Sequence, residues 1–250
     1  CIFETLYTDK MNLIIDIGNT NTKVAVFEND TLVAKNVILQ EELLVFLKKI
    51  KQNFKIKQAI VSAVAKFDTE EREEIEKLFC FLELSKTTRV PFLNLYKTPA
   101  TLGLDRIALI ANAVKQFPQK NVLVIDAGSC ITYDFVNNAS EYIGGSISPG
   151  IKMRFKAMNH FTAKLPLVER YDTESFVGKS TTESMQTGVV LGVVHEIEGF
   201  VNKYKEKYSH LTVVLTGGDT NFLSKQLKSS IFANQNFLLE GLNQVLIFNQ

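Results

Sequence analysis

Two short segments of the sequence combine a carboxylate, glycine and short polar side chains directly after an apolar run. One extends from Asp16 to Lys23, and the other begins at Asp126 and includes Ser129. Glycine allows a ligand to approach the backbone closely, and successive N–H groups in such a turn form a concave anion site. The carboxylate can hold hydrated Mg²⁺ that bridges phosphate oxygens, and Lys23 adds a positive charge. Either segment alone would be interpreted as a common hairpin turn, but the matched pair favours a nucleotide site.

Two further motifs are candidates for related chemistry. Gly217 and Gly218 follow an apolar run and could let an adenine or ribose lie against the next helix, although a plain strand-to-helix turn would look the same. Asp105 and Arg106 open an apolar helical stretch. Asp105 could accept a proton from a substrate hydroxyl while Arg106 binds an anionic group. Asp105 could equally be a favourable first-turn acid paired with Arg106, and the residues alone leave both alternatives open.

Composition and missing motifs exclude several other functions. The 250 residues include 28 Lys+Arg and 27 Asp+Glu, so a net charge of +1 offers no bulk attraction to nucleic acid or to an anionic membrane. No apolar run reaches the ~20 residues that a membrane-spanning helix needs. Three scattered cysteines argue against a disulfide framework and for a reducing, cytoplasmic compartment. The common dinucleotide and P-loop fingerprints are absent, and so is a zinc-ligand spacing.

An internal repeat indicates which elements hold these turns. Residues 13–27 and 123–136 each contain an apolar strand, an Asp at its end, a glycine turn and a second strand, with Asp16 and Asp126 lying 110 residues apart. The pattern predicts further strands near 31–39, 58–64, 140–147 and 211–216, and helices near 40–51, 69–79 and 180–206. Three consecutive strands followed by alternating helix and strand predict a mixed sheet covered by helices. We therefore expect an extension at 1–10 and two similar α/β halves at 11–117 and 118–250.

Taken in order, the motifs closely resemble those of type III pantothenate kinase from Met11 to nearly the C-terminus. The resemblance is carried by Asp16-x-Gly18-Asn19-Thr20-x-x-Lys23, Gly103-x-Asp105-Arg106, Asp126-x-Gly128-Ser129, Gly144-Gly145 with Pro149-Gly150, Gly178-x-x-Thr181, and Gly217-Gly218. It implies an actin-like, sugar-kinase-like (ASKHA) fold, in which two duplicated ribonuclease-H-like halves with mixed sheets enclose ATP. It also implies ATP-dependent phosphorylation of pantothenate to 4'-phosphopantothenate, the first step of coenzyme A biosynthesis. The family is typically homodimeric and uses Mg²⁺ and a monovalent cation, K⁺ or NH₄⁺.

The resemblance also implies roles for single residues. Asp105 would be the general base on the primary hydroxyl of pantothenate, and Asp126 would hold the monovalent cation. The substrate-binding positions would be Tyr96, Gly103, Leu104, Asp105, Arg106 and Thr181, the last of which could reach into the site of the partner subunit. The ATP-binding positions would be Asp16, Ile17, Gly18, Asn19, Thr20, Asn21, Thr22, Lys23, Ser129, Gly217 and Gly218. The sequence departs from the family where Ser129-Cys130 replaces the usual Thr-Ala, which keeps the hydroxyl donor but enlarges the next side chain.

Two other hypotheses are compatible with the same fold. The chain could be a non-catalytic, nucleotide-binding transcriptional accessory factor of the same family, but a regulator needs no base, so the intact Asp105–Arg106 pair disfavours this hypothesis. A sugar or acetate-type kinase or a polyphosphate hydrolase could share the fold, and the Gly-x-Asp-Arg motif argues against these.

Overall fold

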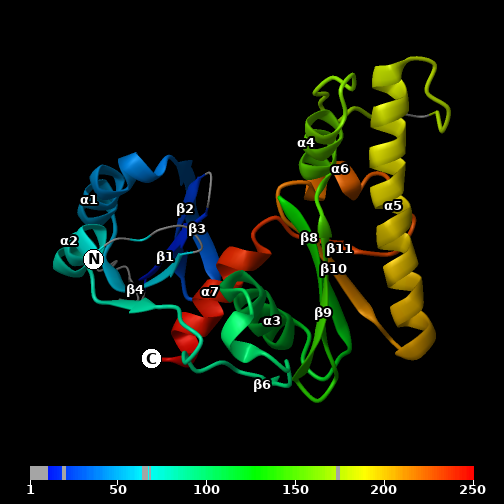
Figure 1. Ribbon diagram of the computed structural model, residues 1–250. Coiled ribbons are helices and arrows are strands. Elements are labelled where there is room, and N and C mark those ends of the chain that lie inside the picture. Colours follow the sequence, from blue (N-terminus) through cyan, green and yellow to red (C-terminus); the bar gives the residue numbers. More distant parts are fainter. Residues whose placement is uncertain (1–10, 19–20, 64–66, 68, 173–174) are drawn as a thin grey trace, which may run out of the picture. The chain divides into compact units, whose positions relative to one another are not determined.

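The computed structural model describes residues 11–18, 21–63, 67, 69–172 and 175–250. Asn19 and Thr20, and the extension expected at 1–10, therefore lie outside the described residues. The chain divides into two compact units (Figure 1). The first comprises the described residues up to Phe92 together with Lys97–Lys115 and Leu238–Gln250, and the second comprises Leu93–Tyr96 and Gln116–Phe237.

The first unit is built on a five-stranded mixed sheet with the order β3-β2-β1-β4-β5. Its strands are β1 (Met11–Ile17), β2 (Thr22–Glu28), β3 (Thr31–Ile38), β4 (Ile56–Ala63) and β5 (Phe81–Glu83). Strands β1, β2 and β3 form an antiparallel meander, whereas β4 is parallel to β1 and β5 is parallel to β4. The helices are α1 (Leu43–Asn53), α2 (Thr69–Leu78), α3 (Leu104–Gln116) and α7 (Phe237–Phe248), with short 3-10 turns η1 (Gln40–Glu42) and η2 (Pro99–Thr101).

Helices cover the first sheet, which explains why β1 is apolar at nearly every position. Leu13, Ile15 and Ile17 pack in one core cluster with Leu47 of α1 and Ile75 of α2. Strands that are buried on both faces lose the alternation of apolar and polar residues. The sequence LIIDI therefore predicts a central strand, and β1 is one.

Helix α7 comes from the far end of the chain and is fastened to this sheet by polar contacts. The buried amide of Asn12 on β1 donates to Asn243 Oδ1 at 2.8 Å, and Gln244 Nε2 donates to Asp30 Oδ1 at 2.7 Å. Gly241 lies so close to α3 that a Cβ there would be 2.6 Å from the carbonyl carbon of Ala108. Helix α7 thus holds both the first strand and the helix that carries Asp105.

The second unit repeats this plan in a six-stranded sheet with the order β11-β10-β7-β8-β9-β6. Its strands are β6 (Leu93–Asn94), β7 (Val122–Ala127), β8 (Cys130–Val136), β9 (Glu141–Pro149), β10 (Thr212–Thr216) and β11 (Phe232–Ala233). The helices are α4 (Ile151–Phe161), α5 (Thr181–Lys207) and the short α6 (Thr220–Leu223). Helix α5 runs along one face of this sheet (Figure 1), where Val193 and Ile197 join the core formed by β7, β8 and β10.

The strand pairing confirms the duplication predicted from sequence. Strands β7, β8 and β9 form an antiparallel meander like β1, β2 and β3, and β10 is parallel to β7 as β4 is to β1. Asp16 lies in register between Lys23 and Ser62, and Asp126 lies in register between Thr132 and Thr216. The two aspartates therefore occupy the same topological position in their sheets.

The compact units are not contiguous along the chain, because α7 joins the first unit and Leu93–Tyr96 joins the second. The sequence boundaries of the two halves, 11–117 and 118–250, stay a prediction.

The helices of the structure lie close to the ranges expected from the sequence. The stretch expected near 180–206 is α5, and the one expected near 40–51 is the η1 turn followed by α1. None of the helices described combines the length and apolar character needed to cross a membrane.

Candidate active site

The first candidate turn joins β1 to β2 in the first unit. Gly18 N donates to the carbonyl oxygen of Asn21 at 3.2 Å, and a Cβ on Gly18 would lie 3.0 Å from the same oxygen. Ile17 ends β1 and Thr22 begins β2, and both are fully buried. The chain thus reverses tightly at Gly18, and the side chain of Asn21 is left exposed.

Asp16 lies at the buried base of this turn. Its carboxylate is 3.3 Å from Lys23 Nζ, the side chain opposite it on β2. Burial raises the pKa of Asp16, the Lys23 ammonium opposes that rise, and the charge of Asp105 adds to it. Asp16 and Asp105 therefore lie within electrostatic range of one another. This closeness is required if one carboxylate is to hold a metal–phosphate complex while the other acts as a base in the same site.

Asp105 is held at the start of α3 by its own neighbours. Arg106 N donates to Asp105 Oδ1 at 2.8 Å, so the carboxylate binds a backbone N–H of the first helical turn. Gly103 lies against the same oxygen: a Cβ at that position would overlap Asp105 Oδ1 and lie 3.4 Å from its Cγ. Leu104 begins the helix, and Arg106 is 4% exposed. The Gly-x-Asp-Arg motif is thus one structural unit that fixes the direction of a carboxylate.

Two lysines that the sequence reasoning missed lie near Asp105 and Lys23. Burial lowers the pKa of Lys86, and the charge of Asp105 opposes that shift. Burial and the charge of Lys23 lower the pKa of Lys35, which lies on β3. Neither lysine stands in a motif, and only the folding of separate strands and turns brings them near Asp105 and Lys23.

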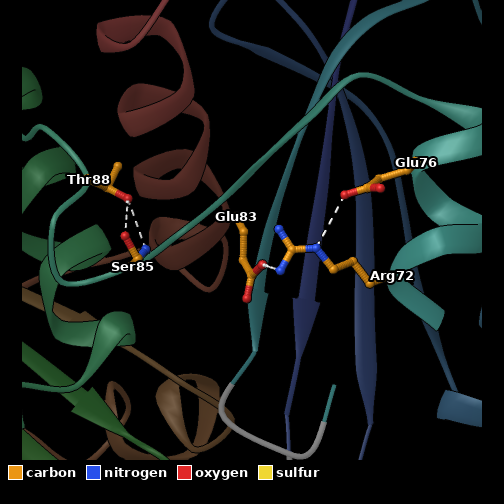
Figure 2. Close-up of polar contacts among 5 residues, drawn as sticks. All are labelled: Arg72, Glu76, Glu83, Ser85 and Thr88. Atoms are coloured by element: carbon orange, nitrogen blue, oxygen red, sulfur yellow. Dashed lines mark hydrogen bonds and ion pairs between the residues drawn. The ribbon is translucent and has the colours of Figure 1, made fainter. Parts of the chain in front are cut away.

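Polar contacts hold the turn that carries Lys86 and the strand that precedes it (Figure 2). Ser85 N donates to Thr88 Oγ1 at 2.9 Å, which closes the turn around Lys86. Just before it, Glu83 on β5 pairs with Arg72 Nη1 of α2 at 2.7 Å, and Arg72 Nε also contacts Glu76. These contacts fix the backbone from which Lys86 extends.

The second candidate turn joins β7 to β8 in the second unit. Gly128 N donates to the carbonyl oxygen of Cys130 at 2.9 Å, and the intervening Ser129 is exposed. Gly150 supports this turn from behind, since its N–H donates to Ser129 O at 3.1 Å. A Cβ on Gly150 would be 2.6 Å from that oxygen and would also overlap Gly128 O.

The Gly217–Gly218 motif meets the same turn. Gly217 has a φ of +95°, and a Cβ there would overlap Asp126 Oδ1 and lie 2.6 Å from the carbonyl carbon of Ala127. Asp219 N donates to Ala127 O at 2.9 Å. Gly218 has open space around its Cα, with no atom within 4 Å of a Cβ added there. Because β7 and β10 are parallel, motifs 90 residues apart in the chain meet at one edge of the sheet.

Tyr96 and Thr181 also belong to the second unit, but both are distant along the chain from its two glycine turns. The ring of Tyr96 stacks on Tyr142 with centroids 6.0 Å apart, and it packs against the space above Gly144. Thr181 begins α5 and borders a cavity of about 640 Å³. That cavity is lined, among the described residues, by Met158, Leu165, Gly178, Lys179, Ser180, Thr181, Ser184 and Met185.

The donor atoms at both turns suit a hard cation. Within the described part of the chain, no three His, Cys, Asp or Glu side chains gather into a metal-binding cluster. Mg²⁺ does not require one, because it keeps several waters and is commonly held by one or two carboxylates and the substrate phosphates. Asp16 and Asp126 each offer one carboxylate, and the carbonyl oxygens of Asn21 and Ala127 belong to the same two turns, so oxygen donors for Mg²⁺ or a monovalent cation are present.

Comparisons with known proteins agree with this arrangement. A model of the type III pantothenate kinase family matches residues 12–203. A type III pantothenate kinase of Christiangramia forsetii is 46% identical over 241 residues, which are 96% of this chain and 99% of the relative. A type III pantothenate kinase of Bacteroides fragilis is 43% identical over 240 residues, which are 96% of this chain and 98% of the relative.

Solved structures show the fold. A protein of Campylobacter jejuni described as a Baf-family transcriptional activator superposes with a TM-score of 0.63 at 23% identity, covering 95% of this chain and 98% of that one. A Listeria monocytogenes protein described as an N-acetylmannosamine kinase superposes with a TM-score of 0.57 at 13% identity, covering 96% and 100%. The sugar-kinase-like fold is thereby confirmed. With a family match over most of the chain and near-full-length relatives at 43% identity or more, the chain belongs to the type III pantothenate kinase family.

Proposed function

We propose that this protein transfers the γ-phosphoryl group of ATP to the primary hydroxyl of pantothenate. The product is 4'-phosphopantothenate, and the reaction is the first step of coenzyme A biosynthesis. The observation that carries the proposal is the fixed carboxylate of Asp105, held by Arg106 N at 2.8 Å and within electrostatic range of Asp16. A base directed in this way beside a phosphate turn is what an alcohol-accepting kinase requires.

Asp105 acts as the general base in this mechanism. Its carboxylate accepts the hydroxyl proton as the oxygen of pantothenate attacks the γ-phosphorus. Phosphoryl transfer leaves little covalent work for the protein, so catalysis depends on alignment and on neutralising charge. Arg106, Gly103, Leu104, Tyr96 and Thr181 contribute to the pantothenate site, with Arg106 binding an anionic group.

The two glycine turns bind the nucleotide. Gly18, Asn21, Thr22 and Lys23, with Asn19 and Thr20, are the residues proposed to bind phosphate at the β1–β2 turn, and Ser129 is proposed to do so at the β7–β8 turn. Mg²⁺, bound when ATP is present, supplies charge neutralisation at the phosphates, and Asp16 is the carboxylate proposed to hold it. Asp126 holds the monovalent cation, K⁺ or NH₄⁺. Gly217 and Gly218 are proposed to bind the nucleoside, and the open space around Gly218 supports this role.

The protein is further proposed to be a cytoplasmic homodimer in which Thr181 reaches the partner subunit's site. The transcriptional accessory function is not favoured. The relatives at 43% identity or more are named as kinases, whereas the likeness to a transcriptional activator at 23% identity concerns the fold alone.

One assay tests the proposal. The purified protein is incubated with ATP and Mg²⁺, with and without pantothenate, in buffers containing K⁺ or lacking monovalent cations other than Na⁺. We expect ADP to form only when pantothenate is present and faster when K⁺ is present. Absence of pantothenate-dependent ADP would refute the proposed reaction, and equal rates in both buffers would refute the monovalent cation at Asp126.

A further inference from the structure

Glu196, in the middle of α5, lies at the centre of a polar cluster outside the motifs described above. Its Oε1 accepts hydrogen bonds from Tyr133 Oη at 2.8 Å and from Ser148 Oγ at 2.5 Å. Its Oε2 accepts one from Arg154 Nη2 at 2.5 Å. One carboxylate therefore joins α5 to β8, to β9 and to α4.

The cluster is partly sheltered from water, so water screens its bonds less than those of a fully exposed ion pair. The side chains of Arg154 and Glu196 are 22% and 23% exposed. Burial alone would raise the pKa of Glu196, but the bonds from Ser148, Arg154 and Tyr133 hold it below its usual value. Glu196 is thus a carboxylate anion at neutral pH, and its bonds are charge-assisted.

Arg154 continues the chain of contacts toward the β7–β8 turn. While Nη2 binds Glu196, Nε donates to the carbonyl oxygen of Pro149 at 2.9 Å. The next residue, Gly150, donates its N–H to Ser129 O at 3.1 Å and is packed against the backbone of Gly128. Ser148 and Pro149 are also paired in register with Ile131 and Cys130. Four bonded steps therefore connect Glu196 to the Ser129 turn.

We propose that Glu196 is a positioning residue for nucleotide binding, which acts through Arg154 and Pro149–Gly150 to hold the Ser129 turn in the conformation that receives phosphate. This inference rests on the proposed function, because it assumes that Ser129 contacts ATP. A planar guanidinium can hold a carboxylate and a carbonyl at once, whereas a lysine offers only one compact charge. Arg154 therefore serves as the link between the anion on α5 and the backbone behind the turn.

The chain provides a matched control on the same helix. Glu198, two residues after Glu196, is also a hydrogen-bonded carboxylate: it accepts from Lys228 N at 2.6 Å and from Ser229 N at 3.0 Å. Its partners belong to the connection between α6 and β11 and have no bonded path to Ser129 among the contacts described. Loss of Glu198 therefore disturbs the second unit without disturbing the turn.

The experiment compares Glu196→Gln, Arg154→Lys and Glu198→Gln in the full-length protein. Steady-state kinetics give kcat and the KM for ATP and for pantothenate, and calorimetry gives the Kd for ADP without pantothenate. We expect Glu196→Gln and Arg154→Lys to raise the KM for ATP and the Kd for ADP about fivefold or more. The KM for pantothenate should stay within about twofold, and Glu198→Gln should change the nucleotide constants by less than about twofold.

A coupling measurement separates positioning from a general loss of stability. If Glu196 acts through the Ser129 turn, the loss in Glu196→Gln/Ser129→Ala is smaller than the product of the two single losses. Multiplicative losses, or equal effects of Glu196→Gln and Glu198→Gln on the ADP Kd, would overturn the inference. Arg154→Lys keeps the test decisive if Glu196→Gln does not fold.

The same data distinguish this inference from the proposed function. Unchanged ATP kinetics in Ser129→Ala would show that Ser129 does not contact the phosphates. That result would refute the role of Ser129 in the proposed function and, with it, the positioning role of Glu196. Weakened ATP binding in Ser129→Ala together with unchanged binding in Arg154→Lys and Glu196→Gln would leave the proposed function standing and refute only the role of Glu196.

Discussion

Substitution of Gly103 by alanine tests whether the direction of the Asp105 carboxylate limits catalysis. A Cβ at residue 103 would overlap Asp105 Oδ1, the oxygen that accepts the hydrogen bond from Arg106 N at 2.8 Å. The backbone of Gly103 does not adopt the positive φ that favours glycine over other residues. The expected effect of Gly103→Ala therefore comes from the overlap rather than from backbone strain.

The size of the effect follows from how far the carboxylate has to move. Restoring an ordinary contact of about 3.5 Å requires Oδ1 to retreat by roughly 1 Å, and its bond to Arg106 N is lost on the way. A displacement of about 1 Å at a reacting group can cost about 10²-fold in rate, within the ~10²–10⁴-fold that a general base contributes. We expect kcat to fall about 10²-fold, while the KM for ATP stays unchanged.

The assay is pantothenate-dependent ADP formation, followed with a thermal unfolding curve for each protein. Gly199→Ala is the control, because Gly199 lies on α5 and has no atom within 4 Å of an added Cβ. That change should leave kcat unchanged and stabilise the protein by about 0.4–1 kcal/mol, since alanine restricts the unfolded chain and suits a helix. If folded Gly103→Ala turned over within about threefold of the unchanged protein, the carboxylate direction would not be limiting.

Three further predictions concern the same site. Asp105→Asn should bind ATP normally but lose ~10²–10⁴-fold in kcat, because the amide cannot accept the hydroxyl proton; nearly normal turnover would contradict the assignment of the base. Gly217→Ala should weaken ADP binding measured by calorimetry at least about tenfold, because φ is +95° and a Cβ would overlap Asp126 Oδ1; unchanged binding would separate this turn from the nucleotide site. Burial raises the pKa of Asp16, so protonated Asp16 favours the folded protein, and this contribution is lost as pH rises through the folded-state pKa. Asp16→Asn should therefore raise the free energy of unfolding at neutral pH by about 0.5–2 kcal/mol while weakening ATP binding, and urea denaturation should show this gain shrinking in acid; a gain that grows in acid would contradict the sign.

Much of the fold follows from short-range patterns in the sequence. The apolar runs ending in Asp16 and Asp126 predict central strands because only strands buried on both faces lose the polar alternation. The similarity of the two segments then predicts two similar sheets, and the strand order confirms them. The tight turns at Gly18 and Gly128 are equally local, since each is closed by a backbone bond within three residues.

The parts that could not be predicted depend on contacts between distant segments. Nothing near Lys86 indicates its closeness to Asp105, which depends on a turn fixed by Arg72 and Glu83 of other elements. Glu196 and Arg154 are 42 residues apart and belong to no motif, so their pairing appears only once α4 and α5 pack together. The spacing of apolar residues in α7 predicts a buried helix but does not indicate which unit it packs in. Its place in the first unit therefore could not be predicted from the sequence.

The path of α7 has a consequence for biosynthesis on the ribosome. The buried amide of Asn12 donates a hydrogen bond to Asn243, which lies 231 residues later in the chain. Gly241 packs against α3, the helix that carries Asp105. Domains generally fold from the N-terminus while the chain is still being made, but here the unit that emerges first lacks one of its packing helices until residues 237–248 have left the exit tunnel. The nascent first unit therefore stays incompletely packed until the rest of the polypeptide is made, and a chain interrupted before α7 would lack the contacts of Gly241 with Ala108 and of Glu240 with Asn112 on α3.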